Sequence, residues 1–147
     1  MTPTIRIQSD DFDLGHEAKL LARAAPGAIA TFTGYVRAED GLSSLTLEHY
    51  PGMTEREIER YVAEAEHRWP LQGVTIIHRI GTLKPDEPIV LVAVAASHRR
   101  EAFEACEFLM DYLKTRAPFW KQETKGADTR WVEAKPSDDQ AAQRWSK

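Results

Sequence analysis

The stretch between Ser97 and Pro118 constrains the fold more than any other part of the chain. Its apolar side chains recur at the spacing of one helix face, at Phe103, Cys106, Met110 and Leu113. This spacing predicts a single long amphipathic helix that opens near Ser97, with Ser97 as its capping residue, and stops before Pro118. Both ends of this helix are basic, and the segment after it places further basic residues around a proline and two aromatic side chains.

Strands and helices are intermixed along the rest of the chain. Apolar, β-branched runs predict strands over residues 4–8, 28–36, 45–49, 74–80, 89–95 and 129–133. Apolar residues at helical spacing predict further helices over residues 14–24, 54–68 and 137–145. The expected N-terminal signals are a cap at Asp13 and capping boxes at Thr54–Glu57 and Ser137–Gln140. Because the order is not strictly alternating and 74–80 should form a hairpin with 89–95, the pattern favours an α+β fold with a mixed, mostly antiparallel sheet and packed helices.

The length and composition limit the classes of protein to which the chain can belong. We expect residues 1–147 to form one domain, because 147 residues suffice for a proper core. The net charge of −4 disfavours a nucleic-acid surface but is compatible with a local basic pocket for a small anion. The one cysteine, Cys106, excludes an internal disulfide, and its place on the apolar stripe favours a core residue. No membrane span and no signal peptide are found, so a cytoplasmic protein is the expectation.

Common catalytic and metal-binding motifs give no match. The five histidines lack paired ligand spacing and have no cysteine partners, so no metal site is expected. No P-loop, dinucleotide-binding glycine motif or nucleophile elbow occurs. The pair Ser97-His98 hints at a serine hydrolase, but adjacent side chains rarely face one another, which favours the capping role of Ser97.

Three groups of basic residues are candidates for binding or chemistry. Arg37 follows a predicted strand, and His98 and Arg99 lie at a helix N-terminus, where backbone N–H groups favour an anion. Lys114 and Lys121 lie in the aromatic segment, where a pair of basic groups can bind an acidic group and move protons. The structural alternatives stay open: a solvated loop arginine, a lysine favourably placed at a helix C-terminus and an exposed loop lysine.

The length of the predicted helix separates two of these groups. If the helix is unbroken, His98 and Lys114 lie 16 residues apart. At the helical rise this is about 24 Å, too far for one small-molecule site. Either the two ends serve different functions, or two copies of the chain meet antiparallel and form a composite site at a two-fold interface. The second arrangement predicts that Arg99 of one copy lies near Lys114 and Lys121 of the other.

Several stretches resemble one protein family. They are TFTGYVR, LTLEHYPGMTE, RWPL, VTIIHRIGTL, ASHRREAFEA, MDYLKTRAPFWK and RWVEA. Together they resemble the MoaE family, the catalytic (large) subunits of molybdopterin synthase, over residues 27–145. The most distinctive are MDYLKTRAPFWK and LEHYPGMTE, which are too long for a chance similarity.

The resemblance implies a function and a set of partners. Members of the family convert cyclic pyranopterin monophosphate (precursor Z) into molybdopterin by inserting two sulfur atoms. The sulfur arrives as a thiocarboxylate on the C-terminal Gly-Gly of a small ubiquitin-like subunit, without a metal or redox cofactor. The family fold is α+β with a hammerhead-like subdomain. The large subunit forms a homodimer that binds one small subunit on each outer side, giving a heterotetramer.

The resemblance also implies site residues. The catalytic lysines of the family match Lys114 and Lys121. Its substrate-binding positions match Tyr35, Val36, Arg37, His98, Arg99, Lys114, Lys121, Gln122 and Glu123. The substrate's phosphate suits Arg37 and the His98-Arg99 pair, and the anionic thiocarboxylate suits the two lysines. We expect the lysines to orient the thiocarboxylate, to stabilise the tetrahedral carbon formed when water attacks a thioester, and to move a proton; a covalent lysine adduct is the open alternative.

Two functions of other classes are weighed against this one. A non-catalytic scaffold would bind the ubiquitin-like sulfur carrier without turnover, and the retained lysines argue against it. A phosphometabolite hydrolase would use His98 as its base and would release phosphate in the absence of any protein partner.

Overall fold

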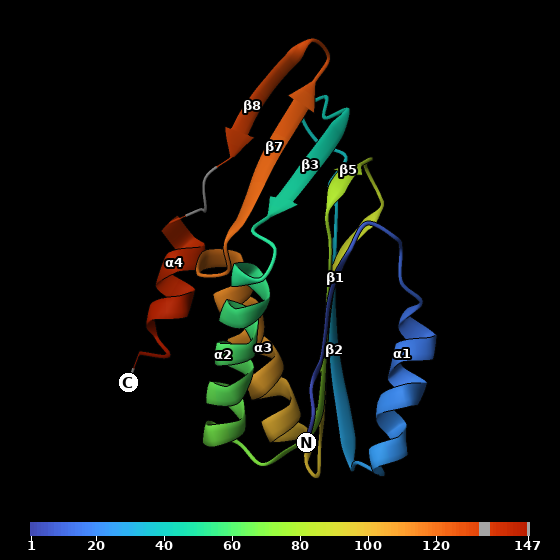
Figure 1. Cartoon of the computed structure of the whole chain (residues 1–147), viewed down its shortest axis with the longest axis vertical. Coiled ribbons are helices and arrows are strands. Elements are labelled where there is room, and N and C mark those ends of the chain that lie inside the picture. The colour runs from blue at the N-terminus through green and yellow to red at the C-terminus, as the bar shows by residue number, and fades with distance from the viewer. Residues whose placement is uncertain (133–135, 147) are drawn as a thin grey trace.

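The computed structural model describes residues 1–132 and 136–146, which form two four-stranded sheets with flanking helices (Figure 1). The first sheet has the order β1 (Thr4–Gln8), β4 (Leu71–Arg79), β6 (Pro88–Ala96) and β2 (Ala28–Tyr35). The second has the order β5 (Gly81–Leu83), β3 (Ser44–His49), β7 (Phe119–Lys125) and β8 (Asp128–Val132). The helices described are α1 (Leu14–Leu21), continued by a 3-10 turn (Ala22–Ala24), α2 (Met53–Arg68), α3 (Arg99–Thr115) and α4 (Pro136–Gln143). None of the helices within these ranges is long and apolar enough to cross a membrane.

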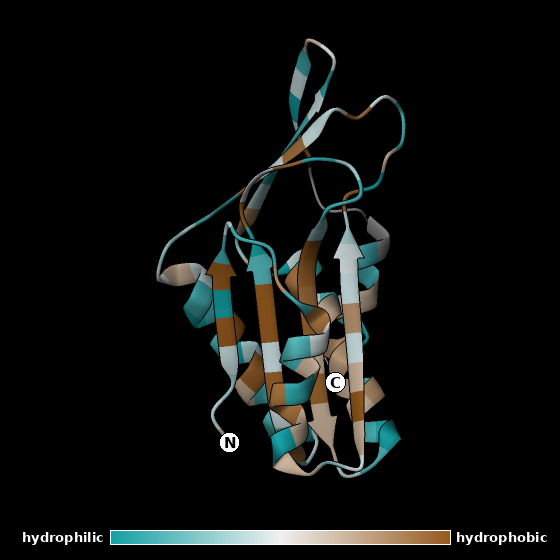
Figure 2. Ribbon diagram, turned by 90° about the vertical axis from the view of Figure 1, so that its right-hand side faces the viewer, coloured by the Kyte–Doolittle hydropathy of each residue, from teal (hydrophilic) through white to brown (hydrophobic). Residues whose placement is uncertain are grey.

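The first sheet is the platform on which the helices pack. β1 runs parallel to β4, and β6 pairs antiparallel with both β4 and β2. In Figure 1, α1 lies on one face of this sheet, whereas α2 and α3 lie on the other. The central strands are largely brown in Figure 2, because strands covered on both faces carry apolar residues throughout. The α+β fold, its mixed, mostly antiparallel sheet and the pairing of residues 74–80 with 89–95 are therefore confirmed.

Helix α3 lies at the centre of the core and confirms the long predicted helix. Its buried face carries Phe108 and Leu109, which are 0 % and 1 % exposed. The Phe108 ring meets three further rings edge-on, those of Trp69, Tyr112 and Trp145. Cys106 is buried on the same helix, as predicted, and burial raises the pKa of its thiol to about 11. The thiol therefore stays protonated at neutral pH.

Two details of the predicted helix are wrong. Phe103 is 65 % exposed, because the face that packs against the sheet runs through Ala105 and Leu109 instead. The helix begins directly after His98, which is its N-cap and makes no side-chain capping bond. Ser97 therefore does not cap the helix.

The start of α2 also differs from the prediction. Its N-cap is Gly52, whose N–H donates to the Glu55 carboxylate at 2.9 Å, so the capping box predicted from Thr54 is wrong. The Thr54 hydroxyl instead accepts from the Tyr50 N–H and donates to the Pro118 carbonyl, both at 3.0 Å. Thr54 thereby joins the start of α2 to the segment that leads into β7.

The sequence pattern missed β5 and β7. The residues of β7 are FWKQETK, which were predicted as part of a loop. This strand pairs antiparallel with β3 and with β8, and such partners stabilise a strand whose composition is not typical of one. Glu133, the predicted end of the last strand, lies outside the described residues, as does the side chain of Ser137, the predicted cap of α4.

Candidate active site

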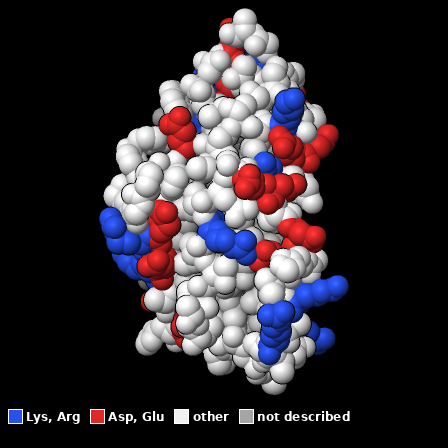
Figure 3. All heavy atoms as spheres, turned by 45° about the vertical axis from the view of Figure 1, so that its right-hand side comes forward, with Lys and Arg blue, Asp and Glu red and all other residues white. Residues whose placement is uncertain are grey.

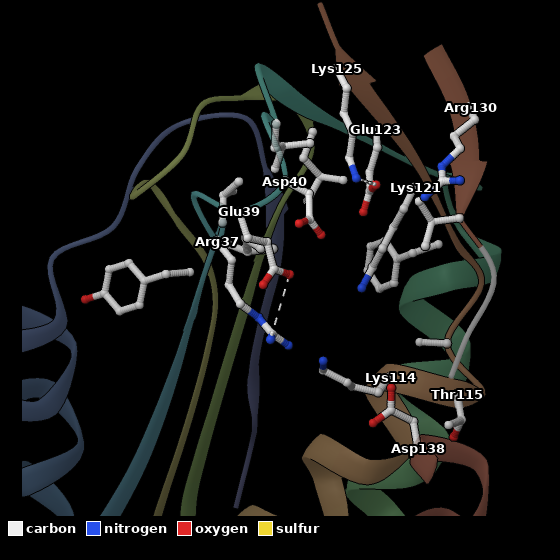
Figure 4. A pocket seen from close by; sticks show the side chains of 18 residues that line it. Arg37, Glu39, Asp40, Lys114, Thr115, Lys121, Glu123, Lys125, Arg130 and Asp138 are labelled. Atoms are coloured by element: carbon white, nitrogen blue, oxygen red, sulfur yellow. Dashed lines mark ion pairs between the residues drawn. The ribbon is translucent and has the colours of Figure 1, made fainter. Parts of the chain in front are cut away.

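A pocket of about 360 Å³ opens where the end of β2, the C-terminal end of α3 and one face of β7 and β8 meet (Figure 4). Its walls carry five basic and four acidic side chains: Arg37, Lys114, Lys121, Lys125, Arg130, Glu39, Asp40, Glu123 and Asp138. On the face of the molecule in Figure 3, basic and acidic side chains are interspersed and form no continuous basic band on that face. A local group of cations on an acidic chain can attract a small anion.

Backbone hydrogen bonds fix the wall from which Arg37 extends. The register of β2 against β6 shifts directly after Gly34, and a glycine within a strand is a common place for such an irregularity. The Val36 N–H donates to the Glu87 carbonyl at 2.9 Å, and the Val36 carbonyl accepts from the Asp86 N–H at 2.8 Å. Arg37 therefore follows a residue whose N–H and carbonyl are both fixed by hydrogen bonds.

The Arg37 guanidinium is only loosely paired. Its side chain is 65 % exposed, and its Nη1 lies 3.9 Å from Glu39 Oε1. In Figure 4, Arg37 points into the space that Lys114 and Lys121 also face. A guanidinium with so weak a contact can exchange it for a phosphate or carboxylate. The same wall includes two more predicted residues, the exposed Tyr35 and the buried Val36.

The last turn of α3 places Lys114 at one side of the pocket. The turn ends at Thr115, whose hydroxyl donates to the Asp111 carbonyl at 2.8 Å. A cation is favoured here because the C-terminal end of a helix carries partial negative charge. Asp138 from α4 lines the pocket near Lys114 (Figure 4).

Strand β7 directs alternate side chains into the pocket. Phe119, Lys121, Glu123 and Lys125 line it, as the two-residue period of a strand requires. Lys125 Nζ lies 3.9 Å from Glu123 Oε2. The same period places Gln122 on the opposite face of β7, away from the pocket.

His98 and Arg99 are exposed at the other end of α3. The helix is unbroken over 17 residues, so within one chain His98 and Lys114 are about 24 Å apart. The pocket gathers six of the predicted site residues: Tyr35, Val36, Arg37, Lys114, Lys121 and Glu123. The pocket does not include Gln122, His98 or Arg99.

His78, at the end of β4, is a buried residue beside the pocket that the sequence pattern did not single out. Its ring stacks on Phe119, with centroids 3.8 Å apart and ring planes at 15°. Its Nδ1 lies 2.8 Å from the Arg79 carbonyl, and Nδ1 must carry the proton because a carbonyl only accepts. Burial lowers the pKa of His78 to about 4, and the charges of Lys121 and His49 act in the same direction. The sequence signal for this residue was only a position within a predicted strand.

Acid is expected to destabilise the fold through His78. Unfolding returns its pKa to the ordinary 6.5 from about 4 in the fold, so the unfolded state binds a proton first as the pH falls. This contribution to stability is complete above about pH 6.5 and is lost towards about pH 4, a change of about 3 kcal/mol. Urea unfolding between about pH 7 and pH 4.5 measures it. His78→Phe should remove this part of the acid dependence, and an unchanged slope of unfolding free energy against pH in that variant would contradict the account.

Known proteins resemble the chain over nearly all of its length. The family model described as MoaE protein matches residues 7–116. The molybdopterin synthase catalytic subunit of Mesorhizobium japonicum is 58 % identical, over 99 % of this chain and 94 % of that protein. The molybdopterin synthase catalytic subunit of Escherichia coli is 56 % identical, over 91 % of this chain and 92 % of that protein. The solved structure of the molybdopterin biosynthesis MoaE protein from Burkholderia ambifaria matches with a TM-score of 0.85 at 53 % identity, over 98 % of each chain.

Proposed function

The chain belongs to the MoaE protein family, and from this we propose that the pocket between β2, α3 and β7 is its site as the catalytic subunit of a molybdopterin synthase. The chain is thus an enzyme that transfers sulfur in molybdenum cofactor biosynthesis. One observation carries the assignment of the site: Arg37 from the loop after β2, Lys114 from α3 and Lys121 from β7 face one pocket (Figure 4).

The substrate in this proposal is cyclic pyranopterin monophosphate, and the pocket suits such a pterin that bears a phosphate. Its volume of about 360 Å³ falls within the range of about 300–1,000 Å³ that small-molecule sites occupy. The Arg37 fork can bind two phosphate oxygens at once. The Glu123 carboxylate can accept hydrogen bonds from the amino groups of the pterin.

The two lysines handle the sulfur donor, the C-terminal thiocarboxylate of a small ubiquitin-like subunit. Lys114 and Lys121 orient this anion from two walls of the pocket. When its sulfur bonds to a carbon of the pterin's side chain, the C–O bond that this carbon carried breaks and the oxygen leaves with the electron pair. The carrier is then joined to the pterin through a thioester. Water then adds to the acyl carbon, the ammonium groups stabilise the resulting oxyanion, and the acyl C–S bond breaks. Sulfur stays on the pterin, the carrier leaves as a carboxylate, and a second carrier delivers the second sulfur.

The proton in this step passes through one of the two lysines. Both Lys114 and Lys121 line the pocket, so either can donate to the departing sulfur or accept from the attacking water. A covalent adduct between a lysine and the substrate is the alternative route.

A second copy of the chain completes the site in this proposal. His98 and Arg99 are exposed at the far end of α3, and an antiparallel copy would bring them to the pocket of its partner, where they add positive charge for the phosphate. One small subunit on the outer side of each copy would give a heterotetramer, working in the cytoplasm. The arrangement fails if Arg99 of one copy and Lys114 of the other stay more than about 20 Å apart in a dimer structure.

Reconstitution tests the function. The chain is mixed with cyclic pyranopterin monophosphate and thiocarboxylated small subunit, and we expect molybdopterin, with two carriers consumed for each product. Binding of the small subunit without any product would favour the non-catalytic scaffold. Release of phosphate in the absence of the carrier would favour a hydrolase with His98 as its base.

Replacing Arg37 by alanine is expected to raise KM for the pterin phosphate by about 10- to 100-fold, because a charge-assisted hydrogen-bonded contact worth about 1.5–3 kcal/mol is lost. The value of kcat should fall far less, since the phosphate is bound equally in the ground state and the transition state. Initial rates at saturating carrier measure both constants. Arg23→Ala, at an exposed position on the 3-10 turn, is the matched control; equal KM values in the two variants would contradict the role of Arg37.

A further inference from the structure

His78 lies where it can control the position of Lys121. Its side chain is 6 % exposed, and its ring stacks on the ring of Phe119. Phe119 and Lys121 are alternate residues of β7, and both line the pocket. A contact that fixes the Phe119 ring therefore also fixes the start of the strand that carries the Lys121 ammonium.

Hydrogen bonds to the main chain act together with this stack at the start of β7. The Thr54 hydroxyl donates to the Pro118 carbonyl at 3.0 Å, and the Phe119 N–H donates to the Ala117 carbonyl at 2.9 Å. These bonds fix main-chain atoms but do not set the rotamer of the Phe119 side chain. The His78 ring, parallel to within 15° at 3.8 Å, packs directly against that side chain, which also lies against the hydrophobic core.

The His78 ring is itself held, and it faces positive groups. Its Nδ1 donates to the Arg79 carbonyl at 2.8 Å, which fixes the orientation of the imidazole. The charged groups acting on it are Lys121 on β7 and His49 on β3, and His49 in turn lies 4.0 Å from the Glu55 carboxylate on α2. Burial and the nearby lysine both oppose a proton on Nε2.

We propose that His78 is a positioning residue for Lys121: an uncharged ring that stacks on Phe119, aligns the first residues of β7 and adds no second positive charge beside the lysine. The inference rests on the proposed function, in which Lys121 handles the sulfur donor. His78 neither touches the substrate nor carries a proton in the reaction. Its loss should therefore lower kcat, while KM for the pterin phosphate, which depends on Arg37, should change little.

Two substitutions distinguish a stacking role of the His78 ring from other roles of this residue. His78→Phe keeps a flat, neutral ring, whereas His78→Ala removes it. In the reconstituted synthase with thiocarboxylated small subunit, we expect His78→Ala to lower kcat by about 10- to 100-fold and His78→Phe to stay within about threefold of the wild type. The KM for the pterin phosphate should stay within about twofold in both. If His78→Ala does not fold by circular dichroism, His78→Leu replaces it, because leucine keeps most of the volume without a ring.

Three kinetic outcomes would overturn the proposal. One is wild-type kcat in the variant without a ring. Another is an equal loss of kcat in both variants. If one limb of the pH–rate profile also disappeared in these variants, His78 would be identified as a proton carrier. The third is a rise in KM with kcat unchanged. The proposed function fails separately, when the wild-type chain itself makes no product in this assay.

A spectroscopic measurement tests the neutral ring independently of turnover. Long-range ¹H–¹⁵N NMR of histidine-labelled chain, with His78→Phe to assign the signal, reports the tautomer and charge of the His78 imidazole. We expect a neutral ring with its proton on Nδ1 at pH 7. A doubly protonated ring, or a proton on Nε2 alone, would overturn the proposal whether or not the preparation is active.

Discussion

Replacing Lys114 by alanine is expected to lower kcat for molybdopterin formation by about a thousandfold or more, because no donor then meets the charge that develops on the acyl oxygen from that side of the pocket. Lys114 lines the pocket from the last turn of α3, at an exposed position outside the hydrophobic core. Folding and binding of the small subunit should therefore be intact. Single-turnover formation of molybdopterin from pre-bound thiocarboxylated carrier measures the effect without interference from product release.

Two further variants make this result specific to Lys114. Lys19→Ala removes an exposed lysine from α1, on the opposite face of the first sheet, and should leave the rate unchanged. Lys114→Arg keeps the charge but replaces a compact ammonium by a planar fork, so we expect only partial recovery. Wild-type activity in Lys114→Ala would show that the role assigned to this lysine is wrong.

The largest effect on stability is expected at Phe108. Its side chain is 0 % exposed and is surrounded by the rings of Trp69, Tyr112 and Trp145. Phe108→Ala removes these contacts and leaves a cavity, which should lower the free energy of unfolding by about 3–5 kcal/mol. Urea unfolding followed by circular dichroism measures this difference.

Phe103 provides a matched control on the same helix. Its side chain is 65 % exposed, so Phe103→Ala should change the free energy of unfolding by no more than about 0.5 kcal/mol. Equal losses of stability in the two variants would contradict the assignment of the buried face of α3.

The long periodic elements could be predicted from the sequence, and the departures from them have physical causes. β4 and β6 are apolar along most of their length because helices cover both faces of the first sheet. In α3 the small residues Ala102 and Ala105 face the sheet. The prediction from hydrophobicity alone assigned the larger Phe103 to this buried face.

β7 shows why part of the site was not predicted. Its charged residues alternate because one face lines the pocket, and its strand conformation depends on pairing with β3 and β8, which are distant in sequence. Family resemblance singled out Lys121 within this segment, but only the fold reveals that Gln122 faces the other way. The contacts of His78 with Phe119 and of Thr54 with Pro118 have no local signal, because each joins residues that are distant in sequence.

The most direct test of the central claim is a crystal structure of the chain with cyclic pyranopterin monophosphate bound. We expect the phosphate within hydrogen-bonding distance of the Arg37 guanidinium and the pterin between Lys114 and Lys121, inside the pocket of β2, α3 and β7. His98 and Arg99 at that phosphate should come from a second copy of the chain. A pterin bound elsewhere, with this pocket left empty at saturating ligand, would contradict the account.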